Sequence, residues 1–187
     1  MKKFLIVTLS VSIVLIGFSV LSVAEEKEKQ VGNWTVIVEE DPLTDKLTVL
    51  LFMNSNQGKE ESSVRALYIR LQEGTTDLFL VWKNEVLDKN KILYRFDKGE
   101  VKEAVWNMAT NKKGLFFPDE RKDLESFVER LIKAEKFIVG AKPQGRIRTT
   151  DVFELEGLGK ALSPYLEEFG WEGLEETIKD EMEGTEE

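Results

Sequence analysis

The most informative stretch of the sequence is Trp34-Thr35-Val36-Ile37-Val38-Glu39, where one set of alternate positions is wholly apolar. A period of two places successive side chains on opposite faces of a β-strand. The same period continues through Leu47-Val49-Leu51-Met53 and, with interruptions, as far as Pro118. We therefore predict that residues 32–118 form β-strands.

Six further segments share this richness in β-branched and aromatic residues, and they are 64–68, 78–82, 92–96, 101–106, 136–142 and 146–155. Short turn-forming connections separate them, for example Pro143-Gln144-Gly145. Connections of this length favour antiparallel hairpins and meanders.

The period becomes helical in two places. Apolar residues recur at helical spacing over about 119–135, where Asp119 is a good N-cap, and again over about 156–169. Pro164 either kinks the second helix or starts another short helix capped by Ser163.

These elements predict a mainly β fold with a single domain over residues 32–171. We expect an antiparallel β-sandwich or partly open barrel of about eight strands, with two amphipathic helices covering an edge or end. Residues 25–31 are interpreted as a charged linker. Residues 172–187 are interpreted as an acidic, partly disordered tail with too little apolar surface to dock firmly.

Residues 1–24 have the three-part layout of a secretory signal peptide. Lys2 and Lys3 precede an apolar run from Phe4 to Val23, and Ser22-Val23-Ala24 provides a small-residue end. The layout predicts an extracytoplasmic protein, periplasmic or secreted. The alternative is an uncleaved anchor, because the run approaches the roughly 20 residues of a spanning helix. Membrane contact is expected only through this leader.

The composition narrows the possible functions. The 187 residues carry a net charge of −9 and include neither cysteine nor histidine. An acidic chain lacks the basic footprint of a nucleic-acid-binding protein. Without cysteine and histidine there is no thiolate nucleophile, and the usual general base and zinc ligand are missing. We expect no metal or cofactor, and a partner that is an envelope protein or a cell-wall component.

The segment 39–45 places four carboxylates within seven residues. Oxygen ligands of this kind attract calcium, but the segment lacks the alternating acids and the turn glycine of a calcium loop. An acidic hairpin loop is the favoured interpretation. Asp41 and Asp45 are the candidate interaction surface.

Aromatic and arginine residues offer two more candidate sites. The four tryptophans, Trp34, Trp82, Trp106 and Trp171, with Phe116-Phe117, form either a glycan platform or part of the core, and the core is favoured. Three arginines in apolar strands either pair with carboxylates or bind an anionic ligand, and they are Arg70, Arg95 and Arg148. Two carboxylates flanking a sugar can hydrolyse glycosides, but no pair stands out among 35 acidic residues.

Read in order, several of these segments resemble the TagO/VasI family, exported accessory proteins of bacterial type VI secretion gene clusters. The matching pieces begin with Trp34-Thr35-Val36, Asp41-Pro42-Leu43-Thr44-Asp45, Leu67-Tyr68-Ile69-Arg70, Tyr94-Arg95-Phe96-Asp97 and Trp106. They end with Phe153-Glu154-Leu155-Glu156-Gly157-Leu158, Ala161-Leu162-Ser163-Pro164 and Gly170-Trp171. The resemblance covers about residues 33–171 and rests on order and spacing.

The resemblance implies a non-enzymatic envelope accessory or binding domain whose matched residues are scaffold. The alternative function is a carboxylate-dependent hydrolase of envelope glycan, namely peptidoglycan. The family pattern has cysteines at two positions that hold Leu71 and Phe169 here. If those cysteines form a disulfide, its replacement by two hydrophobes implies that Leu71 and Phe169 pack near each other.

Overall fold

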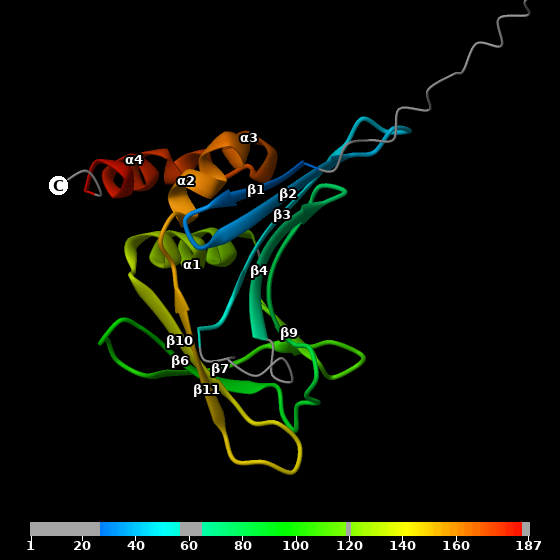
Figure 1. Cartoon of the computed structure of the whole chain (residues 1–187), viewed down its shortest axis with the longest axis vertical. Coiled ribbons are helices and arrows are strands. Elements are labelled where there is room, and N and C mark those ends of the chain that lie inside the picture. The colour runs from blue at the N-terminus through cyan, green and yellow to red at the C-terminus, as the bar shows by residue number, and fades with distance from the viewer. Residues whose placement is uncertain (1–26, 57–64, 119–120, 185–187) are drawn as a thin grey trace, which may run out of the picture.

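The computed structural model describes residues 27–56, 65–118 and 121–184, and these residues form two antiparallel sheets (Figure 1). The seven-stranded sheet contains, in spatial order, β1 (Lys27–Val31), β2 (Trp34–Glu40), β3 (Leu47–Asn54), β4 (Arg65–Gln72), β5 (Thr75–Trp82), β9 (Gly114–Phe116) and β8 (Asn107–Met108). The four-stranded sheet contains β11 (Thr149–Glu154), β10 (Lys136–Ala141), β6 (Lys91–Phe96) and β7 (Lys102–Val105). The mainly β prediction is confirmed, and within the described residues neither sheet closes into a barrel.

The helices are α1 (Arg121–Lys133), α2 (Leu158–Leu162), α3 (Leu166–Phe169) and α4 (Glu175–Gly184). One face of the seven-stranded sheet is covered at one end by the four-stranded sheet and at the other by α1 and α2 (Figure 1). Buried side chains from both sheets and all four helices form one apolar cluster. The seven-stranded sheet is therefore one layer, and the four-stranded sheet with α1 and α2 is the other. The core lies between them, as expected for a two-layer domain.

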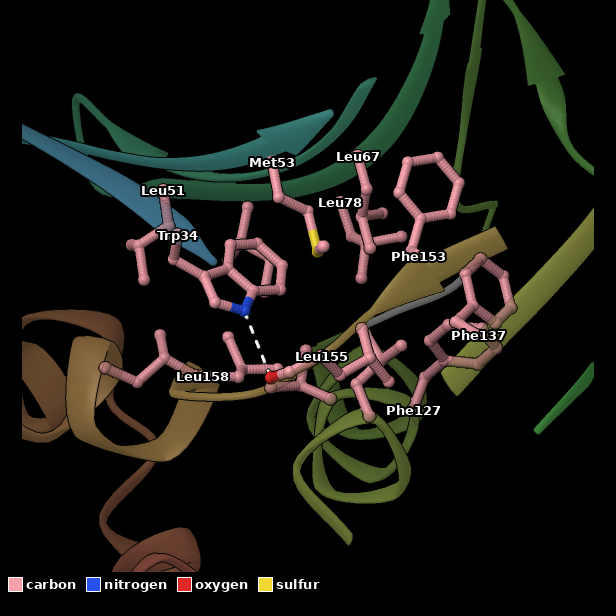
Figure 2. Close-up of a cluster of buried hydrophobic side chains, with 14 of the residues drawn as sticks. Trp34, Leu51, Met53, Leu67, Leu78, Phe127, Phe137, Phe153, Leu155 and Leu158 are labelled. Atoms are coloured by element: carbon pink, nitrogen blue, oxygen red, sulfur yellow. Dashed lines mark hydrogen bonds between the residues drawn. The ribbon is translucent and has the colours of Figure 1, made fainter. Parts of the chain in front are cut away.

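The four tryptophans serve this core. Trp34 and Trp171 are 0% exposed, and Trp82 and Trp106 are 1% exposed. Figure 2 shows the Trp34 ring between residues of the large sheet and residues of α2 and the β11–α2 connection. The core interpretation of the tryptophans is confirmed.

The second predicted helix is interrupted. α2 ends at Leu162, a 3₁₀ turn spans Ser163–Tyr165, and α3 then begins at Leu166. Pro164 lies at the start of the 3₁₀ turn, where its missing N–H costs no helical hydrogen bond. The N-cap of this turn is Leu162 and that of α3 is Tyr165, so the alternative of a helix capped by Ser163 is wrong. The proposed cap of the first helix, Asp119, lies outside the described residues.

Two predictions about the ends of the domain are wrong over the described residues. Of the predicted linker 25–31, residues 27–31 form edge strand β1, which pairs with β2 along its whole length, and residues 25–26 lie outside the described part. An edge strand is half-exposed, so charged residues are compatible with it. The acidic tail folds as a 3₁₀ turn (Glu172–Leu174) followed by α4, and Leu174 and Ile178 are 2% and 3% exposed. A few apolar residues at helical spacing are enough to dock it. The end of the tail, residues 185–187, lies outside the described part, so the expected disorder there is not tested.

A close backbone contact joins the β1–β2 turn to the connection between β11 and α2. Asn33 N–H donates to the Glu156 carbonyl at 3.1 Å, and the Trp34 indole N–H donates to the Leu155 carbonyl at 3.2 Å (Figure 2). Gly32 and Gly157 face each other here, both with positive φ, at 56° and 87°. A Cβ on Gly157 would lie 2.9 Å from the Val31 carbonyl oxygen and 3.0 Å from the Gly32 Cα. Only glycine allows this approach.

We predict that Gly157→Ala lowers the free energy of unfolding by about 2 to 3 kcal/mol or more. The cost of a positive φ in a residue with a Cβ and the cost of the clash with the Val31–Gly32 backbone add together. The matched control is Gly74→Ala, which shares a positive φ of 77° but has no atom within 4 Å of the added Cβ. It should cost only about 1 kcal/mol. Urea unfolding measures both, and equal losses would mean that the close contact contributes nothing.

Leu71 and Phe169 are both buried in the same cluster, at 5% and 1% exposure, and Phe169 stacks on Trp171. Their mutual contact stays a prediction. A double-mutant cycle with Leu71→Ala and Phe169→Leu should give a coupling energy of at least about 0.5 kcal/mol. Strictly additive losses would contradict the contact that the family resemblance implies.

Candidate functional site

The most strongly desolvated carboxylates of the described residues lie in a buried network where the two sheets meet. Arg65, at the start of β4, donates from one terminal nitrogen to Asp151 of β11 at 3.0 Å and from the other to Glu85 at 2.8 Å. Ser55 Oγ lies 3.2 Å from the same Asp151 oxygen. Arg146 covers Glu85 from the outside at 2.9 Å. We call these five residues the sheet clamp.

Burial dominates the electrostatics of the sheet clamp. Asp151 is 0% exposed, and this desolvation raises the pKa of its carboxyl even though Arg65 and Ser55 oppose the shift. The two facing acids outweigh the effect of burial on Arg65 and raise the pKa of its guanidinium. Each charge in this network has a partner, so the removal of any one of them would leave an uncompensated buried charge.

The sheet clamp does not resemble a hydrolytic site. A glycosidase needs an acid and a second carboxylate that both reach the substrate. Here Arg65 holds both carboxylates, and the Asp151 side chain is only 1% exposed. One Asp151 oxygen has no hydrogen-bond partner among the described residues, but it points to no substrate-accessible surface.

The acidic loop between β2 and β3 is a self-contained turn. One Asp41 carboxylate oxygen accepts from the backbone N–H groups of Leu43 at 2.7 Å and Thr44 at 3.1 Å. Asp45 has a positive φ of 54° and donates its N–H to the Asp41 carbonyl at 2.9 Å. These bonds are those of a hairpin loop, as favoured from the sequence. No group of three potential metal-ligating side chains occurs in the described part of the chain. The role of Asp41 and Asp45 as an interaction surface stays a prediction.

Four stacked rings cross the outer face of the seven-stranded sheet, and they belong to Phe52, Tyr68, Phe79 and Phe116. Successive ring centroids are 5.5, 4.8 and 4.8 Å apart. Each inner ring therefore has both faces covered by its neighbours. A sugar stacks on the face of an aromatic ring, so the two inner rings, Tyr68 and Phe79, stabilise the sheet and offer no face to a glycan. Phe117 instead packs edge-on against Trp106.

The three candidate arginines are placed differently. Arg70 lies in β4 and Arg95 in β6, but Arg148 comes just before β11, so the prediction that it lies in a strand is wrong. Arg70 pairs with Asp77 on the neighbouring strand and lies over the Phe79 ring. Arg95 and Arg148 have no carboxylate partner among the described residues. Both line a hollow on the face of the four-stranded sheet that is turned away from the core. Arg70 thus has the structural role, whereas Arg95 and Arg148 have no ion-pair partner within residues 27–56, 65–118 and 121–184.

We call this hollow the arginine trough. Its volume is about 180 Å³, and its lining includes Leu93, Arg95, Val101, Ile138, Gly140, Arg148 and Thr150. The opposite faces of the same strands hold Ile92, Phe137 and Val139, each 0% exposed. Alternation along β6 and β10 therefore separates a core face from the outer face that holds the trough.

Gly140 shapes the trough. A Cβ at this position would lie 3.1 Å from Arg148 Cδ and 3.5 Å from its Cγ. The aliphatic part of Arg148 thus lies across β10 in the space that any other residue would fill. The glycine brings this guanidinium group onto the apolar floor, which is how arginine stems commonly pack.

Sequence reasoning found part of this arrangement. Arg95 and Arg148 were identified as candidates, but nothing in the sequence placed Gly140 beneath Arg148. The sheet clamp was missed because Arg65 and Asp151 are 86 residues apart. One signal could have revealed the sheet clamp: Arg65 and Asp151 are oppositely charged residues within two apolar predicted strands, 64–68 and 146–155.

Comparisons with known proteins add no family. No family model, curated protein or solved structure matches this chain. Among the described residues, no helix has the length and apolar character needed to cross a membrane. The leader lies outside that part.

We predict that Arg65→Leu lowers the free energy of unfolding by at least about 3 kcal/mol near neutral pH, because Asp151 and Glu85 lose their shared cation. Without Arg65, the pKa of Asp151 rises further in the folded state. The folded variant then binds a proton that the wild-type protein does not, so acidification stabilises the variant relative to wild type.

The stability gap should therefore narrow as the pH falls from about 7 to about 4 in a series of denaturant titrations. Arg70→Leu is the control, because its partly exposed pair should contribute no more than about 1 kcal/mol and depend little on pH. If the difference in free energy of unfolding between the wild-type protein and Arg65→Leu does not change with pH, the loss of stability comes from packing alone.

Proposed function

We propose that this chain is an exported, non-enzymatic accessory or binding domain of the bacterial cell envelope, of the kind that the TagO/VasI resemblance implies. Its proposed location is extracytoplasmic, and its proposed partner is an envelope protein or a cell-wall component. The ligand-binding surface of this proposal is the arginine trough.

Two features of the sequence support the proposal. Residues 1–24 have the layout of a signal peptide. The pieces that carry the family resemblance are also consistent with a shared scaffold, because Trp34 donates a hydrogen bond to Leu155 across 121 residues. Such a contact joins two distant segments of the core, so both segments are needed for the same fold.

The observation that carries the proposal is a contrast between two sites. The two buried acids of the sheet clamp, Asp151 and Glu85, are bridged by Arg65 and closed to a substrate. The open hollow instead presents two arginines, unpaired among the described residues, beside apolar side chains. Sealed acids and accessible cations favour ligand binding over acid–base catalysis.

We predict that the exported protein releases no soluble fragments from purified peptidoglycan. Asp151→Asn and Glu85→Gln serve as controls, since a hydrolase that used the sheet clamp would lose its activity with either change. Chromatography of the digest measures release. Turnover by the wild-type protein that either substitution abolishes would overturn the non-enzymatic proposal.

Expression of the full chain in a bacterial host tests the location. Mass spectrometry of the exported protein should find a mature start at Glu25, because peptidase cleavage follows the small residues of Ser22-Val23-Ala24. An intact chain that begins at Met1 and stays with the membrane would support the anchor alternative instead.

A further inference from the structure

We propose that the arginine trough binds the carboxylate groups of an acidic, partly apolar peptide segment of a partner polypeptide. This inference rests on the proposed binding function and specifies its ligand. It is carried by the charge, the shape and the position of the trough.

The charge of the trough is concentrated in two guanidinium groups. Lys91, on the same face, is paired with Glu103 at 2.7 Å, and nearby Lys142 is paired with Asp88 at 3.1 Å. Arg95 and Arg148 alone line the trough without an acid partner in the described part of the chain. Guanidinium forks match planar carboxylates by paired hydrogen bonds, so one or two carboxylates complete the site.

The floor of the trough selects for apolar neighbours of those carboxylates. Leu93, Val101 and Ile138 supply apolar side chains beside the guanidinium groups. A volume of about 180 Å³ is below the ~300 Å³ lower limit of small-molecule pockets, so the trough suits one or two side-chain ends. The chain's net charge of −9 repels a long polyanion, so a phosphate polymer is disfavoured.

The trough also lies beside a free sheet edge. β7 is the last strand of the four-stranded sheet. Two of its flanking or terminal residues, Val101 and Val105, are 56% and 58% exposed. A segment held in the trough can also cover the exposed Val101 beside this edge, which adds an apolar contact to those with the two arginines.

A titration tests the proposal with a defined probe. The probe is a blocked synthetic pentapeptide in which two glutamates alternate with leucine and valine, added to the isotope-labelled exported protein. NMR should show saturable amide shifts at Leu93, Ile138 and Gly140. A peptide with glutamine in place of both glutamates should bind at least tenfold more weakly, because its amides carry no charge.

Variants separate specific recognition from general attraction. Arg95→Gln and Arg148→Gln should each weaken binding by about tenfold. Lys91→Gln is the matched control, since it removes the same charge from the same face but from a cation already paired with Glu103. Gly140→Ala should also weaken binding, because it displaces Arg148 without any change of charge. The amide spectrum of each variant reports directly whether it is folded.

Four outcomes would overturn the proposal: no saturable shift, equal binding of the glutamine peptide, an equal loss for Lys91→Gln, or inorganic phosphate binding as tightly as the peptide. The last outcome would identify a general anion site. None of them depends on the peptidoglycan and export measurements, so failure of this inference is distinguishable from failure of the proposed function.

Discussion

The structure depends on the attachment of strand β11 to both sheets. β11 pairs with β10 in the four-stranded sheet along its whole length. Near its start Asp151 accepts from Arg65 of the large sheet, and just beyond its end Leu155 accepts from Trp34. Asn56 N–H adds a bond to the Val152 carbonyl at 3.0 Å. These contacts fix the two sheets relative to each other, and the apolar cluster fills the space between them.

The alternation of β11 gives its two faces different roles. Asp151 and Phe153 point inward, to the sheet clamp and the core, while Thr150 points outward into the arginine trough. A strand held rigidly from the inside is a good support for a binding surface on the outside, because the position of that surface is then set by packing. The buried carboxylate of Asp151 and the outward-facing trough thus both depend on the position of β11.

The sequence predicts strands well where only one face is apolar. In β2, Trp34 and Val36 alternate with more exposed residues, and the prediction agrees with the structure. In β4 both faces are apolar: Leu67 and Ile69 are buried in the core, whereas Tyr68 lies on the outer face of the sheet. Periodicity cannot choose between two apolar faces.

Long-range pairing explains most of what the sequence does not reveal. A charged segment such as β1 becomes a strand because β2 lies beside it, and no local pattern records this neighbour. The sheet clamp likewise needs the topology before Arg65 and Asp151 can be paired. Arg95 and Arg148 were visible as candidates because cations are rare in apolar strands, but their freedom from acid partners depends on the pairing of every carboxylate around them.

The two ends of the domain differ in charge. The α3–α4 region carries Glu167, Glu168, Glu175 and Glu183 around one groove. The four-stranded sheet, with Arg95 and Arg148, lies at the other end of the domain (Figure 1). An anionic segment that approaches this acidic protein is repelled at the helical end and attracted at the small sheet, so the long-range field favours encounters in the orientation that the trough requires. Because such steering acts between exposed charges, it weakens with added salt, whereas the contacts inside the trough are screened less.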